Sequence, residues 1–191
     1  MIVQNPKRIT RQELYQLGLE AQGSINRIYL HWTAGHYGQA YDDYHINIDK
    51  EGEVYLTCQK LTEFKYHTYR RNSSAIGIAL CCGYDAQCGD AKARSVYFGP
   101  EPPTHLQFLA LAQAVAVLCD ALQLEIGYAT VTTHAEAAYQ DGYGPGSGDP
   151  EVRWDLLYIP EEFNPQHLRP GGVALREKAI LLKQAAGKQT A

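Results

Sequence analysis

The sequence lacks a cluster of basic residues. Its 17 Lys and Arg are outnumbered by 21 Asp and Glu, which gives a formal net charge of -4. Proteins that bind nucleic acid without sequence preference draw their affinity from clustered Lys and Arg, so we exclude that class. Apolar residues make up 45% of the 191 residues and charged residues 20%, which predicts a soluble globular domain with a substantial core.

Long apolar runs are also missing. The most apolar stretch, FLALAQAVAVLC at residues 108–119, is too short to cross a bilayer and contains Gln113. The stretch MIVQNPKRITRQELYQLG has no continuous apolar core of the kind that a secretory signal needs. We therefore expect no membrane insertion, synthesis in the cytoplasm without a signal peptide, and action outside the membrane only after release.

Cysteines at zinc-finger spacing are absent. The chain has five cysteines, an odd number, and none of them forms a Cys-x-x-Cys pair. We expect them to be mostly reduced, and Cys81, Cys82 and Cys119 lie in apolar runs where small core residues fit. A metal site built on cysteine is therefore disfavoured.

Local patterns predict the order of the elements. Thr10 with Glu13, and Thr104 with Gln107, are capping boxes that predict helices beginning after each threonine. Alternating apolar residues predict strands at 27–34 and 128–134, and a hairpin at 44–57. The nearly continuous apolar run at 74–82 predicts a strand buried on both faces, and 171–188 predicts an amphipathic last helix.

This order predicts one α/β domain over residues 1–191, with a central mixed β-sheet flanked by helices. The motifs described below fall within about residues 25–160. We expect residues 161–191 to form a helical extension of that core.

Two of the seven histidines stand out by position. His31 and His134 each end a predicted strand, and open α/β sheets place their sites at the carboxyl ends of strands. Two imidazoles and one carboxylate, with a fourth position left to water, form a common catalytic zinc site. Such an ion lowers the pKa of its water from about 15.7 to about 7 and polarises a carbonyl.

The carboxylate is expected in the segment GPGSGDPEVRWDL, residues 144–156, which contains Asp149 and Asp155. The part GPGSGDP is typical of a turn, since glycine permits unusual backbone angles and Asp149 precedes a proline. The part VRWDLLYI gives Asp155 apolar neighbours that can hold its side chain rigidly. These local features favour Asp155 and indicate a loop-capping role for Asp149.

Four stretches together carry a family resemblance: IYLHWTAG, DDYHINIDKEGEVY, HTYRRNSSAIGIALCCG and TTHAEAA. In this order and spacing they resemble the zinc-dependent N-acetylmuramoyl-L-alanine amidases of type 2, relatives of phage lysozyme-type amidases and peptidoglycan recognition proteins. The resemblance covers about residues 25–160. Ala75 departs from it, because that strand often carries Ser.

The resemblance implies a zinc ion held by His31, by His134 and by a third ligand in the following loop. In the family a Lys often stands two residues before the third ligand. Arg153 occupies that place before Asp155, whereas Ser147 occupies it before Asp149. The resemblance therefore also favours Asp155, with Trp154 expected to face away and pack.

The resemblance further implies catalytic roles for Tyr44 and Arg153. Tyr44 matches a tyrosine that orients or deprotonates the attacking water, a place that other members fill with Glu. Arg153 would stabilise the oxyanion of the tetrahedral intermediate in place of the usual Lys. Because the pKa of Arg lies above about 12, it is a poor proton donor, and any acid needed there must come from another group or from water.

Four residues are expected to contact substrate: His45, His67, Trp32 and Glu136. The resemblance places His45 and His67 along the groove, where each could instead support a metal ligand. Glu136 lies two residues after His134 and could instead orient a ligand imidazole.

The implied function is hydrolysis of the amide between N-acetylmuramic acid and L-alanine in bacterial peptidoglycan, by a monomeric phage or prophage endolysin. Three alternatives remain open. The chain could bind peptidoglycan without cutting it, could act on soluble muropeptides as a recycling enzyme, or could be an antibacterial effector.

Overall fold

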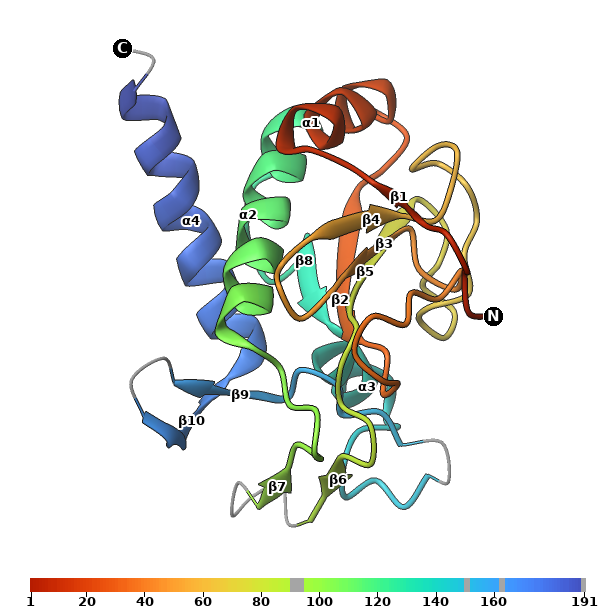
Figure 1. The fold of residues 1–191 in the computed structure, drawn as a ribbon, viewed down its shortest axis with the longest axis vertical. Coiled ribbons are helices and arrows are strands. Elements are labelled where there is room, and N and C mark those ends of the chain that lie inside the picture. The colour runs from red at the N-terminus through yellow and green to blue at the C-terminus, as the bar shows by residue number, and fades with distance from the viewer. Residues whose placement is uncertain (90–94, 150–151, 162–163, 190–191) are drawn as a thin grey trace.

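The computed structural model describes residues 1–89, 95–149, 152–161 and 164–189 (Figure 1). Within these residues the helices are α1 (Arg11–Glu20), α2 (His105–Ala121), α3 (His134–Asp141) and α4 (Gly171–Gln189). The strands are β1 (Lys7–Arg8), β2 (Arg27–Trp32), β3 (Ile46–Ile48), β4 (Val54–Leu56), β5 (Ala75–Leu80), β6 (Gln87–Cys88), β7 (Val96–Tyr97), β8 (Val131–Thr133), β9 (Tyr158–Glu161) and β10 (Asn164–Pro170).

The central sheet is mixed and has six strands in the order β1-β4-β3-β5-β2-β8. Strands β3, β5, β2 and β8 run parallel to one another, whereas β4 pairs antiparallel with both β3 and β1. The prediction of a single α/β domain with a central mixed sheet flanked by helices is confirmed. The hairpin expected at 44–57 corresponds to β3 and β4.

Helices α1 and α2 begin where their capping boxes predict. The side chains of Thr10 and Thr104 each accept a hydrogen bond from the backbone N–H three residues on. The side chains of Glu13 and Gln107 in turn accept a hydrogen bond from the backbone N–H of the capping threonine. Each box satisfies N–H groups that the first turn of a helix leaves without an intrahelical partner.

Helix α2 lies between the central sheet and α4 (Figure 1). It is buried along most of its length, in keeping with its nearly all-apolar sequence. The side-chain amide of Gln107 donates hydrogen bonds of 3.1 Å to the carbonyls of Ile48 and Cys81, which joins α2 to the ends of β3 and β5. Cys81, Cys82 and Cys119 are fully buried, as expected of core residues.

The second half of the chain differs from the prediction in two places. The strand expected at 128–134 ends at Thr133, and His134 begins the unexpected helix α3. The helical extension expected from residue 161 begins only at Gly171, because Asn164–Pro170 form strand β10, which pairs with β9. Three prolines between residues 160 and 170 obscure the strand pattern, because proline cannot donate to a β-ladder.

Among the described residues, no helix combines the length and apolarity needed to cross a membrane.

Candidate metal centre

His31 and His134 are brought together by the parallel part of the sheet. His31 lies near the carboxyl end of β2, and β8 runs parallel beside β2 with Leu30 opposite Thr133. His134 follows Thr133 directly, so both imidazoles leave the same edge of the sheet. This is the edge at which parallel sheets place their sites.

Asp155 reaches the two histidines from the loop after α3. The backbone N–H of Ala135 donates a hydrogen bond of 3.3 Å to the main-chain carbonyl of Asp155, which ties the loop to the first turn of α3. The next residue, Leu156, is fully buried and has a φ of 57°, a conformation that L-residues rarely adopt. The backbone beside the carboxylate is thus held by packing in a strained conformation.

The three side chains converge on one point. His31 Nδ1 lies 3.1 Å from His134 Nδ1 and 3.1 Å from Asp155 Oδ2, and His134 Nδ1 lies 3.2 Å from Asp155 Oδ1. A tetrahedral zinc site with ordinary bond lengths separates its ligand atoms by about 3.3–3.5 Å. The spacing and chemistry of this set fit a zinc ion, and the three residues form a buried group able to hold a metal.

The protonation states also fit metal binding. Burial lowers the pKa of His31 to about 4, so its imidazole is neutral at pH 7. Burial alone would raise the pKa of Asp155, but the charge of His134 and the hydrogen bonds to His134 and His31 lower it below its ordinary value. A neutral imidazole at His31 and an ionised carboxylate at Asp155 are the forms that bind a cation.

The ring of His31 is oriented by Thr68, a residue that the sequence did not single out. The hydroxyl of Thr68 lies 3.3 Å from His31 Nε2 and 3.0 Å from His67 Nδ1. If His31 Nδ1 faces a metal, its Nε2 carries the proton and donates it to Thr68. The Thr68 hydroxyl then donates to His67 Nδ1, which fixes the orientation of both imidazoles.

His67 packs directly on the backbone of β5 at Gly77. A Cβ atom added at Gly77 would lie 2.6 Å from Cδ2 and Cγ of His67, closer than real Cβ contacts allow. Burial, with the nearby His31 and His45, lowers the pKa of His67 to about 2. A glycine at this position is therefore what admits the His67 ring beside His31.

A groove of about 1160 Å³ opens over the three convergent residues. His134 and Asp155 are in its lining, together with Trp32, Tyr44 and His67. Other lining residues come from the loop after β4 and the loop after α3, and they include Phe64, Tyr66, Tyr69, Tyr143 and Arg153. The candidate centre is thus accessible from a groove large enough for a peptide or sugar fragment.

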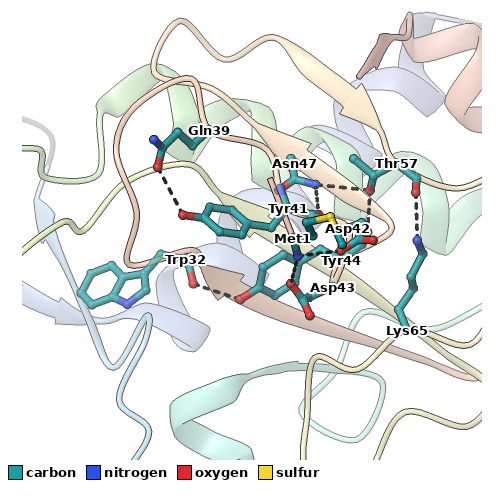
Figure 2. A network of polar contacts seen from close by, with 10 residues as sticks. All are labelled: Met1, Trp32, Gln39, Tyr41, Asp42, Asp43, Tyr44, Asn47, Thr57 and Lys65. Atoms are coloured by element: carbon teal, nitrogen blue, oxygen red, sulfur yellow. Dashed lines mark hydrogen bonds and ion pairs between the residues drawn. The ribbon is translucent and has the colours of Figure 1, made fainter. Parts of the chain in front are cut away.

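Tyr44 stands at the edge of the groove beside His31. Its ring centroid lies 5.1 Å from that of His31, and its hydroxyl lies 3.5 Å from the Trp32 carbonyl that accepts its hydrogen bond (Figure 2). The Thr57 hydroxyl donates a hydrogen bond of 2.5 Å to the Tyr44 carbonyl and thereby anchors its backbone. Burial and the Asp155 carboxylate raise the pKa of Tyr44 above its ordinary value, so its hydroxyl is protonated at neutral pH.

Arg153 and Trp154 lie on the same loop as Asp155 but in different surroundings. Arg153 is exposed in the groove lining, and its positive charge acts on Tyr44 and Tyr143. The Trp154 ring packs edge-on against Trp32, with centroids 4.7 Å apart and an interplanar angle of 90°. The packing expected of Trp154 is therefore present.

Asp149 is exposed and lies outside the three-residue cluster, although it lines the groove.

A family model described as N-acetylmuramoyl-L-alanine amidase (Amidase_2) matches residues 21–147. The chain belongs to this family. The matched span includes His31, Tyr44 and His134, whereas Arg153 and Asp155 lie beyond its end. Asp155 is thus identified as part of the cluster by geometry, not by the match.

Several solved structures are similar to this chain at low identity. The endolysin N-acetylmuramoyl-L-alanine amidase LysCS from Clostridium intestinale URNW is 18% identical over 58% of this chain and 69% of its own, with a TM-score of 0.41. The Ph2119 endolysin from a Thermus scotoductus MAT2119 bacteriophage is 20% identical over 59% of this chain and 72% of its own, with a TM-score of 0.43. PGRP-Hd from Alvinella pompejana is 16% identical over 82% of this chain and 88% of its own, with a TM-score of 0.40. Likenesses of this strength carry no argument about substrate. The comparison with curated proteins gave no match.

Within this amidase family member, the predicted substrate contact at His45 is replaced by a structural role. His45 is fully buried and is not in the groove lining. Its Nε2 donates to the carbonyl of Glu63 at 2.7 Å, and its Nδ1 accepts from the N–H of Gly77 at 3.0 Å. Both ring nitrogens of His45 therefore bind main-chain groups.

The predicted substrate contact at Glu136 also needs correction. Its two carboxylate oxygens each lie 2.8 Å from the guanidinium of Arg176 on α4, and one of them accepts from the N–H of Thr133. Glu136 is absent from the groove lining. The sequence could not reveal this, since the partner lies 40 residues away in the chain.

Proposed function

We propose that this protein is a zinc-dependent N-acetylmuramoyl-L-alanine amidase that hydrolyses the amide between N-acetylmuramic acid and L-alanine in peptidoglycan. One observation carries the proposal. In a chain of this family, two imidazole nitrogens and a carboxylate converge to within 3.1–3.2 Å at the base of an open groove.

His31, His134 and Asp155 would hold the zinc ion. When bound, the ion supplies a Lewis acid that polarises the amide carbonyl and makes water nucleophilic at neutral pH. The chain contributes a rigid support for these ligands. Thr68 orients His31, and the hydrogen bond from Ala135 holds the backbone of Asp155 against the helix that begins with His134.

Tyr44 is proposed to orient the attacking water. Its raised pKa keeps the hydroxyl protonated, so we favour a hydrogen-bonding role over proton abstraction. Its contact with the Trp32 carbonyl is long, at 3.5 Å, and therefore weak. A substrate or water in the groove can therefore take over the hydroxyl, because the hydrogen bond it replaces is weak.

Arg153 is proposed to stabilise the negative charge that develops on the amide oxygen. The side chain lies in the groove lining two residues before Asp155. A guanidinium keeps its positive charge throughout the pH range of the reaction but gives up a proton poorly. The leaving amine must therefore take its proton from the attacking water or from another group.

The remaining contacts with substrate are assigned to the groove walls. Trp32 is nearly buried and packs between Phe98 and Trp154, so it offers a rigid wall near the ligands. His67 lines the groove through a small exposed part of its ring. We retain both as proposed substrate contacts.

We further propose that residues 1–191 act as one monomeric amidase domain, with a catalytic core of about residues 25–160. Its partner would be bacterial peptidoglycan, and its setting a phage or prophage endolysin that reaches the wall after release. Family membership and the groove support action on the wall. The likeness to endolysins carries no argument for a phage origin.

The test is digestion of purified peptidoglycan sacculi, with mass spectrometry of the released fragments. We expect free L-alanine amino groups and intact glycan strands, loss of activity on chelation, and recovery with Zn²⁺. Soluble muropeptides tested in parallel separate a wall hydrolase from a recycling enzyme. Wall binding without bound zinc or bond cleavage would instead establish a recognition module.

A further inference from the structure

The side chain of Arg176, on the C-terminal helix α4, contacts both elements next to His134. Its Nη1 donates to the carbonyl of Val131 at 2.9 Å and to Glu136 at 2.8 Å, while its Nη2 donates to the other oxygen of Glu136 at 2.8 Å. Val131 is in β8 and Glu136 is in α3. Arg176 therefore bridges the strand and the helix that flank His134.

This ion pair is enclosed. The side chains of Arg176 and Glu136 retain only 12% and 20% of their accessible surface. The Arg176 guanidinium also lies over the ring of Tyr128, 5.4 Å from its centroid. A Cβ atom at Gly172 would lie 2.3–2.5 Å from the Glu136 carboxyl group, so a larger residue at that position would have to displace this carboxyl group.

Glu136 transmits the position of Arg176 to the start of α3. Its carboxylate accepts from the Thr133 N–H at 3.0 Å, and its own N–H donates to the Thr133 hydroxyl at 3.2 Å, which closes the capping box of α3. His134 is the first residue of that helix. The backbone conformation of His134 is therefore held by the same carboxylate that Arg176 binds.

The same helical turn also holds the third proposed ligand. The N–H of Ala135 donates to the backbone carbonyl of Asp155 at 3.3 Å. A shift of the first turn of α3 would displace His134 directly and Asp155 through this bond. The distances among the three convergent side chains thus depend on one turn, and Arg176 fixes that turn from outside.

We propose that Arg176 is a positioning residue for the metal centre, which holds the first turn of α3 through Glu136 so that His134 and Asp155 converge. This inference rests on the zinc site of the proposed function. It assigns a role to α4, which lies beyond the residues matched by the family model.

A second ion pair, between β10 and α4, provides a control. Arg169 donates to Glu177 of α4 at 2.6 Å, but these side chains retain 42% and 56% of their accessible surface. An exposed pair contributes little to stability, whereas removing one partner of an enclosed pair leaves an uncompensated charge. Loss of Arg169 should therefore leave the metal centre unchanged.

The test measures Zn²⁺ affinity by chelator competition and the visible spectrum of the Co²⁺-substituted full chain. The variants are Arg176→Met, Arg176→Lys, Glu136→Gln, the double variant Glu136→Gln/Arg176→Met, and the control Arg169→Met. Circular dichroism of each metal-free protein checks its fold. For Arg176→Met we expect Zn²⁺ affinity to fall by about 10- to 100-fold, as is usual when a residue supporting a metal ligand is lost.

We expect an altered Co²⁺ spectrum with Arg176→Met, partial recovery with Arg176→Lys, and wild-type values for Arg169→Met. The double variant should bind no more weakly than Arg176→Met alone, because the two residues act in series. If Arg176→Met does not fold, the test rests on the Zn²⁺ affinity of Arg176→Lys and Glu136→Gln. Wild-type affinity in both of these variants would overturn the proposal. If the wild type binds zinc and folded Arg176→Met binds it equally well, this inference alone fails. If the wild type binds neither metal, the proposed function fails with it.

Discussion

His31 and His134 bring their Nδ1 atoms to 3.1 Å of each other across 103 residues of chain. Two imidazole nitrogens gain little from such a contact unless a proton or a cation lies between them. The carboxylate of Asp155 faces both rings, which favours a cation at the shared point. Substitutions at neighbouring residues should therefore show how the fold supports that arrangement.

Replacing Gly77 with Ala should destabilise the protein by displacing the His67 ring. The added Cβ would lie 2.6 Å from that ring, and overpacking of a core typically costs about 1–3 kcal/mol. Urea denaturation of the metal-free protein measures the change. In Gly77→Ala/His67→Ala the clash is gone, so the double variant should lose less stability than the sum of the two single variants. Strict additivity would show that the two sites do not interact.

His45 should make stability fall as the pH drops. Burial lowers its pKa from the ordinary value of 6.5 to about 4 in the fold, where its Nδ1 already accepts from Gly77. The unfolded chain therefore takes up a proton first. The difference in pKa contributes about 3 kcal/mol to the free energy of unfolding. This contribution is fully present above about pH 6.5 and is lost progressively as the pH falls to about 4.

Denaturation of wild type and His45→Gln across this pH range checks the effect. Gln cannot titrate there and can still donate and accept, so its stability should fall less between pH 6.5 and 4. Parallel curves for the two proteins would mean that His45 does not account for the loss.

Tyr44→Phe should retain zinc and the fold but lose activity on sacculi. The hydroxyl makes one weak contact in the structure, at 3.5 Å to the Trp32 carbonyl, so little stability depends on it. Loss of one positioned hydrogen-bond donor at a reacting centre typically lowers the rate by about 100- to 1000-fold. Zinc content and initial rates measured on the same preparation separate the two effects. Undiminished activity would remove the proposed role of Tyr44 and leave the metal site in place.

Arg153→Ala should lower kcat by about 100- to 1000-fold, the usual loss for one group that stabilises an oxyanion. Arg153→Lys should recover part of this rate, because it restores the charge without the planar fork. Zinc content should be that of the wild type in both variants, since Arg153 is exposed and outside the cluster. A loss of zinc with Arg153→Ala would assign it a structural role.

The parts of this molecule that follow local rules could be predicted from sequence. The capping boxes at Thr10 and Thr104 located two helices, and the positions of His31 and His134 at strand ends located the candidate centre. The same pattern at Thr133 and Glu136 marks the start of α3, but it overlaps the alternating strand pattern before it. Local patterns therefore compete where a strand runs directly into a helix.

What depends on side-chain direction could not be predicted. Glu136 stands two residues from His134, yet its carboxylate faces Arg176 on a helix far along the chain. His45 neighbours Tyr44, yet its ring nitrogens bind the main chain of Glu63 and of Gly77. Thr68 gave no signal of its own, since its role depends on two histidines that meet only in the fold.

The choice between Asp149 and Asp155 is the central claim, because it decides which part of the loop builds the metal site. Zinc should be measured per chain, by mass spectrometry of the native protein, in wild type, Asp149→Ala and Asp155→Ala. We predict about one zinc ion in the wild type and in Asp149→Ala, and almost none in Asp155→Ala, because two histidines alone leave the ion without its anionic ligand. Zinc retained by Asp155→Ala and lost from Asp149→Ala would contradict the account.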